Sequence, residues 1–190
     1  MTRAIPDVRP WQPGDAALAA AAEPFLSASS LSHRFLAGTA GRLPAAYLRH
    51  IDAGARAEWD AQVAEVPGML LGWAEFGRVP GERETADIAV IVADPWHRQG
   101  IASALIRSLL PRMIEAGVRV MNADVLPSNA AAQALLTSLF APDLRYAYED
   151  GVVRFRAPLT MPAGATANFV RTRASRARVL TTSAAMPGRA

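Results

Sequence analysis

The sequence contains neither cysteine nor lysine. Without cysteine there are no disulfides, no cysteine-bound zinc and no thiol catalysis. Without lysine, all 20 basic residues are arginines, and few groups titrate between pH 7 and the arginines. A net charge of only +3 therefore gives a sequence pI near 10.1, and this pI alone is not a signal for nucleic-acid binding.

Long apolar runs are also missing. No run reaches the roughly 18 residues that a membrane-spanning helix needs, and the first ten residues, MTRAIPDVRP, lack the apolar stretch of a signal peptide. We therefore expect a cytoplasmic protein with no membrane partner. A composition that is 51% hydrophobic and 19% charged is typical of a globular domain, and 190 residues suffice for one such domain.

The charge is distributed unevenly along the chain. The residues after Pro162 include five arginines and no acid, whereas residues 1–162 hold 15 arginines against 17 acidic residues. The body of the protein is therefore slightly acidic. We expect residues 163–190 to form a mobile, Arg-rich tail. Such a tail could contact nucleic acid or acidic partners, but loose arginine runs are more often solvated, so nucleic-acid binding is not expected.

The hydrophobic patterns predict a mixed α/β fold. Strands are expected near residues 5–10, 58–66, 69–78, 85–93 and 118–126, followed by a hairpin that turns at Asp150-Gly151. Helices are expected at 16–29, 43–51, 99–116 and 129–140. Asp15 is a candidate N-cap, Pro24 should interrupt the first helix, and Pro111 should kink or split the third. This order indicates one layered domain without internal repeats.

A polar turn separates an apolar strand from a long helix pattern in ADPWHRQGIASALIRSLL, residues 93–110. The first N–H groups of a helix lack partners within the helix and, with the helix dipole, favour an anion there. Gly100 allows close approach to the backbone, Ser103 adds a hydroxyl, and Arg98 adds charge suited to a diphosphate. The turn is neither a Walker A loop nor a Gly-x-Gly-x-x-Gly loop. By itself it is equally consistent with a glycine that only reverses the chain.

The runs ADIAVIVADPWHRQGIASALI and VLPSNAAAQALL together resemble the GNAT superfamily of acetyl-CoA-dependent N-acetyltransferases. The likeness is nearest to the bacterial protein-lysine-acetyltransferase-like branch. The family's phosphate loop, Gln/Arg-x-x-Gly-x-Gly/Ala, falls on residues 97–102, where Gly100 and Ala102 match and His97 departs from the first position. The resemblance implies a GNAT-like domain over residues 1–162, with a mixed, mostly antiparallel sheet of about seven strands flanked by helices.

The resemblance also implies how acetyl-CoA is bound. The pantetheine arm would lie along residues 90–92, where the fourth and fifth strands splay apart, and a bulge or a loose ladder near 88–91 would produce the splay. A backbone N–H near Val90 would stabilise the oxyanion. Asn129 matches a position on the cofactor side, or is a plain helix N-cap. The expected cofactor-binding residues are Val90, Ile91, Val92, Arg98, Gln99, Gly100, Ile101, Ala102, Ser103 and Asn129.

The acceptor amine arrives as an ammonium, so a base must remove a proton before the amine attacks the thioester. Asp87 falls on a glutamate of the related branch and is the predicted catalytic base. Alternatively, Asp87 lies on a solvent-exposed face of the sheet and has no catalytic role. Glu84 and Glu75 are the next candidates, and Glu75 could instead line the acceptor cleft.

The sequence leaves two possibilities for the general acid, because Leu136 stands where many family members have a tyrosine. Either the thiolate leaves without a dedicated proton donor, or Tyr146 or Tyr148 serves from another strand. The expected function is an N-acetyltransferase that moves an acetyl group from acetyl-CoA to a primary amine, in a small molecule or a protein lysine, by direct attack in a ternary complex. The alternative is a catalytically silent acyl-CoA-binding sensor. The three histidines have no metal-ligand spacing, so no metal is expected.

Overall fold

The computed structural model describes residues 6–159, so the tail predicted at 163–190 lies outside the described residues. The helices are α1 (Asp15–Ala21), α2 (Ala28–Phe35), α3 (Ala45–Asp52), α4 (Ile101–Glu115) and α5 (Ala130–Phe140), with 3-10 turns η1 (Glu23–Phe25) and η2 (Asp94–Trp96). The strands are β1 (Asp7–Pro10), β2 (Trp59–Val66), β3 (Met69–Val79), β4 (Glu82–Val92), β5 (Val120–Val125), β6 (Arg145–Glu149) and β7 (Val152–Pro158).

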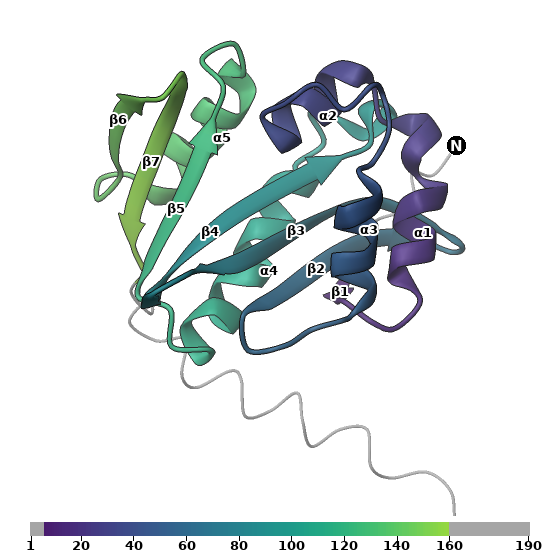
Figure 1. The fold of residues 1–190 in the computed structure, drawn as a ribbon, viewed down its shortest axis with the longest axis horizontal. Coiled ribbons are helices and arrows are strands. Elements are labelled where there is room, and N and C mark those ends of the chain that lie inside the picture. The colour runs from purple at the N-terminus through teal and green to yellow at the C-terminus, as the bar shows by residue number, and fades with distance from the viewer. Residues whose placement is uncertain (1–5, 160–190) are drawn as a thin grey trace, which may run out of the picture. The chain divides into compact units, whose positions relative to one another are not determined.

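The strands form one seven-stranded sheet in the order β1-β2-β3-β4-β5-β7-β6 (Figure 1). Neighbouring strands are antiparallel apart from β4 and β5, which are parallel. The predicted fold class, a mixed and mostly antiparallel sheet of about seven strands flanked by helices, is therefore confirmed.

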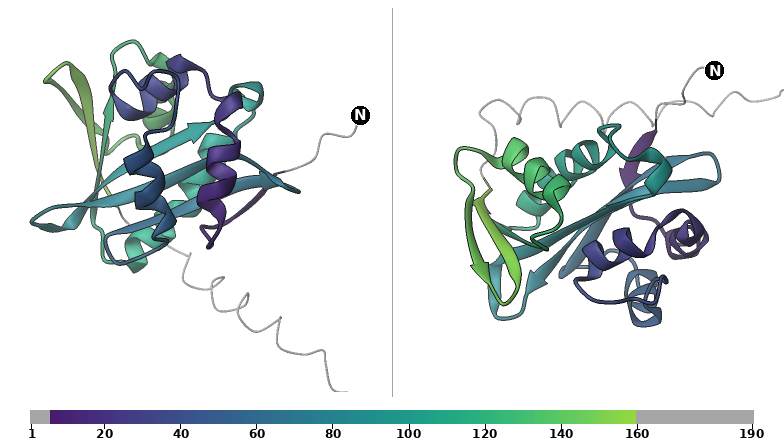
Figure 2. Two further views of the ribbon diagram at one scale, coloured as in Figure 1. Left: turned by 45° about the vertical axis from the view of Figure 1, so that its right-hand side comes forward. Right: turned by 90° about the horizontal axis from the view of Figure 1, so that it is seen from above.

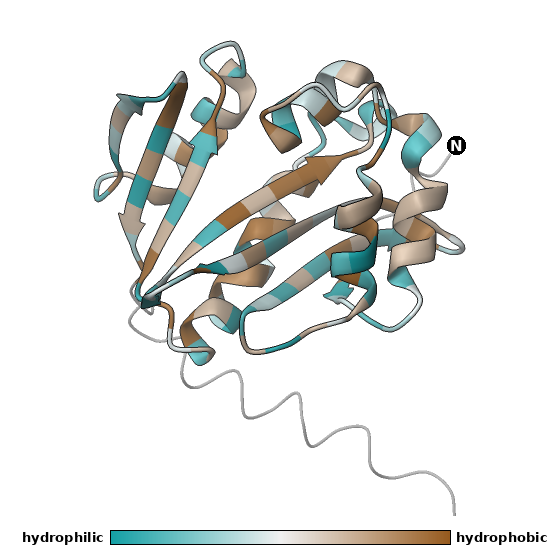
Figure 3. Cartoon of the chain, viewed as in Figure 1, coloured by the Kyte–Doolittle hydropathy of each residue, from teal (hydrophilic) through white to brown (hydrophobic). Residues whose placement is uncertain are grey.

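Helices cover both faces of the sheet. Seen from above, α4 and α5 lie on one face, and α1 and α3 lie on the other (Figure 2). One cluster of buried apolar side chains joins the sheet to α4 through Leu105 and Leu109, and a second packs Leu31, Ile51 and Trp73 beneath the N-terminal helices. Apolar residues gather along β4, whereas β5 and β7 show alternating hydrophilic and hydrophobic bands (Figure 3). This alternation fits strands with one solvated face.

The last hairpin turns where the sequence predicts. Asp150 and Gly151 both have positive φ, 50° and 82°. A two-residue hairpin turn of this kind needs a left-handed backbone at both positions, which Asp-Gly tolerates well. The predicted hairpin between β6 and β7 is confirmed.

Helix α4 carries a stripe of apolar residues along one side. The buried members are Ile101, Leu105, Ile106, Leu109 and Met113, and Leu110 packs partly against the same cluster. The helix is not split at Pro111, because it continues to Glu115. Pro111 cannot donate a hydrogen bond to the carbonyl group of Arg107. Since Arg107 is exposed, water can take the place of the missing donor.

The N-terminal region differs from its prediction in two ways. Asp15 begins α1, but its side chain does not cap the helix. Its carboxylate is buried, lies 2.7 Å from a guanidinium nitrogen of Arg9 and accepts the N–H of Gln12 at 2.7 Å. The ion pair with β1 therefore replaces the predicted cap. The interruption near Pro24 is confirmed, but it is followed by a separate helix, α2, which the side chain of Ser27 caps. Among the helices of residues 6–159, none combines the length and apolarity that crossing a bilayer requires.

Candidate active site

Strands β4 and β5 pair over three residues only. The pairs are Thr85 with Val120, Ala86 with Met121, and Asp87 with Asn122. Past Asp87, the described chain has no further β4–β5 pair, and the two strands diverge (Figure 1). The register between β3 and β4 is continuous from Gly72–Val92 to Arg78–Ala86. The strands therefore separate near residues 88–91 because the ladder between β4 and β5 is short. The alternative predicted cause, a bulge in β4, is not found in its pairing with β3 at these residues.

A groove of about 510 Å³ opens beside this splay. It is lined by the end of β4, the loop that leads into α4, one side of α5 and residues of α2. Gln99 is the one predicted cofactor-binding residue that does not line it, and its side-chain amide donates to the carbonyl oxygen of Pro95 at 3.2 Å. The predicted residues that do line the groove are Val90, Ile91, Val92, Arg98, Gly100, Ile101, Ala102, Ser103 and Asn129.

The turn into α4 leaves a series of N–H groups without partners. Arg98 and Gly100 have positive φ, 60° and 79°. Within residues 6–159, no backbone N–H from 98 to 103 donates to a protein acceptor, and the next amide, that of Ala104, donates to the carbonyl oxygen of Gly100 at 3.0 Å. Because these amides lie at the N-terminal end of a 15-residue helix, the helix dipole adds to their preference for an anion.

Two polar side chains support the walls of the groove. His97, which departs from the family's loop pattern, ties the loop to β4, since its Nε2 lies 2.7 Å from the carbonyl oxygen of Val92. Asn129 caps α5, because its Oδ1 accepts the N–H of Ala132 at 3.1 Å. The N-cap reading of Asn129 is confirmed, and Asn129 also lines the groove.

A smaller cavity of about 70 Å³ lies between the diverging strands. Residues 88–90 of β4 and 123–125 of β5 line its two sides. Leu136, at the position of the family's usual tyrosine, also lines it and is buried. Among the residues that line this inner cavity, Asp124 supplies the carboxylate, and each of its two oxygens lies 2.8 Å from a nitrogen of Arg154.

Asp87 lies where the two strands separate. The side-chain amide of Asn122, directly opposite on β5, donates to Oδ1 of Asp87 at 3.3 Å. Partial burial raises the pKa of Asp87 and the charge of Asp124 adds to the rise, whereas the hydrogen bond from Asn122 opposes it. Asp87 lines neither cavity and is exposed on the sheet surface. It is thus a solvated carboxylate at the edge of the splay, with a pKa shifted in the direction that suits a base.

Glu75 lies in a buried polar network beneath α2 and α3. It pairs with Arg34, and its Oε2 accepts from Tyr47 at 2.9 Å and from Trp59 at 3.2 Å. Burial raises the pKa of Tyr47, and the charge of Glu75 raises it further. The indole N–H of Trp73 donates to the Tyr47 hydroxyl at 2.7 Å. Both carboxylate oxygens of Glu75 are thus engaged by neighbouring side chains, and Glu75 lines neither cavity.

The remaining predicted acids and bases lie away from the cavities. Glu84 is exposed on the part of β4 that precedes the pairing with β5. Tyr146 and Tyr148 are 74% and 69% exposed and line neither cavity. Neither tyrosine is therefore placed to protonate a group held between β4 and β5.

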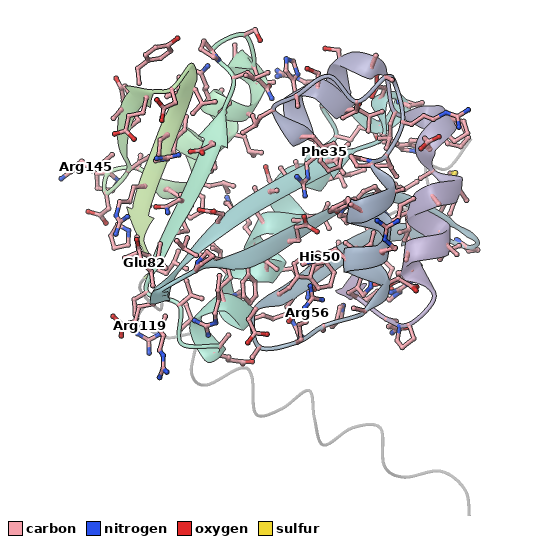
Figure 4. All side chains as sticks on the ribbon, in the orientation of Figure 1. Phe35, His50, Arg56, Glu82, Arg119 and Arg145 are labelled. Atoms are coloured by element: carbon pink, nitrogen blue, oxygen red, sulfur yellow. The ribbon has the colours of Figure 1, made fainter. Side chains whose placement is uncertain are left out.

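Helix α2 brings residues to the site that the sequence does not reveal. His33 and Arg34 line both cavities, and Ser30 lines the groove. Figure 4 labels Phe35, the last residue of α2, near the open end of the strands, and Glu82 at the end where they converge. Sequence spacing gives no signal for these contacts, because α2 and β4 are far apart along the chain. Within residues 6–159, no three His, Asp or Glu side chains are grouped so that they could hold a metal ion.

Comparison with known families identifies the class of protein. The model of the acetyltransferase (GNAT) family matches residues 29–140, which is more than half of the chain and includes α2, β4, the loop before α4 and α5. The chain therefore belongs to the acetyltransferase (GNAT) family and is an N-acetyltransferase. The resemblance read from the sequence is confirmed. No curated protein matches the chain.

Solved structures share the fold. The GNAT domain of PAT from S. lividans has a TM-score of 0.74 at 25% identity, with 81% of this chain and 90% of that chain covered. YncA from Salmonella typhimurium, whose structure contains acetyl-CoA, has a TM-score of 0.62 at 21% identity and coverages of 83% and 96%. The ribosomal-protein-alanine N-acetyltransferase from Brucella melitensis has a TM-score of 0.61 at 19% identity and coverages of 80% and 99%.

Proposed function

We propose that the protein transfers an acetyl group from acetyl-CoA to a primary amine by direct attack while both substrates are bound. The observation that carries this proposal is that the groove and the inner cavity adjoin. His33, Val90 and Asn129 line both. A thioester carrier whose diphosphate lies at the turn into α4 can therefore extend its acyl group into the space between β4 and β5.

The turn fits the diphosphate of coenzyme A. The unpartnered N–H groups of residues 98–103 supply donors, and Arg98 and Ser103 add a guanidinium and a hydroxyl at the same end of the groove. Gly100 carries no side chain that could cover the amides. The bound diphosphate would thus replace solvent at donors that have no partner in the described part of the chain.

The free edge of β4 fits the pantetheine arm. Within residues 6–159, the N–H and C=O groups on the β5 side of β4 have no strand partner past Asp87. The amides of pantetheine can pair with the backbone of Val90 and Val92 as a short additional strand would. A backbone N–H near Val90 would then stabilise the oxyanion of the tetrahedral intermediate, an interaction of about 3 kcal/mol.

Asp87 is the base that we assign to this reaction. It accepts a proton from the ammonium, directly or through water, and the freed amine attacks the acetyl carbon. A pKa above the ordinary aspartate value brings the carboxylate closer to the pKa of the amine, which favours this transfer. The acceptor is a primary amine of a small molecule or of a protein lysine.

One observation favours a second candidate function, a catalytically silent acyl-CoA-binding sensor. Leu136 occupies the place of the usual tyrosine and is buried in the wall of the inner cavity. Asp87 has a shorter side chain than glutamate and lies outside the cavity. A protein that had lost its acid and weakened its base would still hold the acyl carrier.

Calorimetric titration with acetyl-CoA, followed by thiol-release assays over a panel of amines, tests both candidates. For the acetyltransferase, we expect binding of acetyl-CoA and release of thiol with at least one amine. Binding without thiol release across small amines and lysine peptides supports the sensor. A chain that does not bind acetyl-CoA at all contradicts both.

A further inference from the structure

One histidine lines both the groove and the inner cavity. α2 places the half-buried His33 beside the groove and also beside the space between β4 and β5. Leu136 lines the same inner cavity and has no proton to give. The other imidazole of the site, His97, lines the groove only, and its Nε2 is held at the carbonyl oxygen of Val92.

The other polar side chains of the site are poor proton donors to a thiolate. The guanidinium groups of Arg34 and Arg98 keep their protons at any working pH. Ser138 Oγ donates to the carbonyl oxygen of Leu135 at 2.8 Å, and a serine hydroxyl is a far weaker acid than an imidazolium. Among the residues that line the inner cavity, His33 carries the imidazole, whose two ring nitrogens can each hold a proton.

Contacts at both ends of α2 hold His33 in place. At the start of the helix, Ser30 Oγ donates to a carboxylate oxygen of Asp94 at 2.7 Å, which ties α2 to the loop that precedes α4. At its end, Arg34 pairs with the buried Glu75. The ring Nε2 of His33 lies 3.4 Å from the hydroxyl of Ser128, at the start of α5. Two of these contacts hold helix α2, and the third is made by the imidazole itself.

We propose that His33, as the imidazolium, donates the proton that the leaving thiolate of coenzyme A takes up. This inference rests on the acetyl transfer proposed above. The amine nitrogen forms a bond to the acetyl carbon, and the carbonyl electrons move to oxygen. When the carbonyl re-forms, the C–S bond breaks and its electron pair stays on sulfur. Sulfur takes the proton of His33, and the neutral imidazole regains one from water. The ammonium loses its first proton through Asp87 before the attack, and the nitrogen of the tetrahedral intermediate loses a second proton to water. The first of these protons balances the one that the imidazole regains, so the net products are the amide, the thiol and one proton.

The charged and titratable groups that line the same cavities as His33 belong to α2, β5 and the loop before α4. They are Arg34, Asp124, His97 and Arg98. Arg34 is paired with Glu75, and Asp124 is held by Arg154, so neither acts on the imidazole as an isolated charge. Arg98 is taken up by the diphosphate when acetyl-CoA is bound.

The test compares His33→Gln with His50→Gln. His50 lies on α3 beside Arg56, as Figure 4 shows, and lines neither cavity, so its loss controls for removal of a surface imidazole. We expect kcat of His33→Gln to fall about 100-fold or more, the usual contribution of acid–base groups, with the affinity for acetyl-CoA unchanged. His50→Gln keeps the wild-type kcat. Circular dichroism and thermal melting verify that both variants fold.

Two further measurements separate a proton donor from a residue that only shapes the site. The wild-type rate declines at high pH as the imidazolium is lost, and His33→Gln lacks this decline. Added imidazole restores turnover to His33→Ala, whereas it does not restore turnover to Asp87→Asn. Loss of the low-pH limb in His33→Gln would instead make His33 a base.

The outcomes distinguish failure of this inference from failure of the proposed function. A wild-type protein that binds acetyl-CoA but releases no thiol with any amine contradicts acetyl transfer itself. Two results would contradict the role of His33 while leaving acetyl transfer intact, provided that the wild type is active. One is a kcat of His33→Gln equal to that of the wild type, and the other is a failure of imidazole to restore the activity of His33→Ala.

Discussion

At the scale of the residue, Asp87 lies exposed on the sheet surface where β4 and β5 stop pairing, and partial burial of its carboxylate raises its pKa. Replacement by asparagine keeps the shape and removes the base. We expect kcat of Asp87→Asn to fall about 100-fold or more, with the affinity for acetyl-CoA retained. Glu84→Gln removes an exposed carboxylate from the same strand and serves as the matched control. Equal steady-state rates for the wild type and Asp87→Asn would remove Asp87 from the mechanism.

The hydrogen bond from Asn122 allows the pKa of Asp87 to be tested by pH. Under the proposed mechanism activity requires the carboxylate, so kcat/KM should fall as the pH drops through the pKa of Asp87, at a pH above the ordinary aspartate value of 3.8. The bond from Asn122 stabilises the charged form and lowers this pKa. Asn122→Ala should therefore move the acid limb to higher pH. An unchanged or downward-shifted limb in the pH–rate profile contradicts the assignment.

The two glycines at the ends of α4 provide a matched pair of variants to test the proposed diphosphate site. Gly100 and Gly117 both have positive φ, 79° and 87°, and a Cβ added at either meets no atom within 4 Å. Alanine at each should destabilise the fold by a similar amount, about 1 kcal/mol, because of backbone strain. We expect calorimetry to show weaker acetyl-CoA binding for Gly100→Ala only. Equal losses of affinity in both variants would point to general destabilisation.

At the scale of the element, the end of β4 is positioned by a close approach of β3. A Cβ at Gly72 would lie 2.5 Å from the carbonyl oxygen of Ile91 and 2.9 Å from the Cα of Val92. Gly72→Ala must push β4 away at the residues that line the groove. We expect a loss of about 1–3 kcal/mol in the free energy of unfolding, measured by urea denaturation, together with weaker acetyl-CoA binding.

Gly77, on the same strand, provides the control for Gly72. It pairs with Asp87, and a Cβ there meets no atom within 4 Å. Gly77→Ala should leave stability and binding close to those of the wild type. A Gly72→Ala variant as stable as Gly77→Ala would mean that β3 does not fix the position of β4.

At the scale of the whole molecule, most of the fold could be predicted because its signals are local. The Asp150-Gly151 turn needs two left-handed residues next to each other, and the apolar stripe of α4 repeats within a single helix. The loop at residues 97–102 is likewise a contiguous motif. Short-range patterns of this kind specify elements without knowledge of their neighbours.

The rest of the site could not be predicted, because it depends on contacts between distant segments. His33 lies 95 residues from Ser128, and nothing in its sequence surroundings marks it. In the sequence, nothing distinguishes Asp124 from other strand residues. Its place at the inner cavity depends on the contact with Arg154 and on the separation of β4 from β5. Asp15 failed as a cap for the same reason, since a long-range ion pair with β1 outcompeted the local bond.

Because β4 and β5 pair over three residues only, the end of β4 leaves an edge that a bound ligand can pair with. Under the proposed function, acetyl-CoA would pair with the edge of β4 past Asp87, where the seven-stranded sheet has no β4–β5 pair among the described residues. At 100 times its Kd, such a ligand should raise the free energy of unfolding by about 2.7 kcal/mol through mass action. Hydrogen–deuterium exchange should slow at residues 88–92 far more than across β2 and β3. Acetyl-CoA would then pair with β4 as an additional strand does. A uniform decrease in exchange rate over all strands would contradict this.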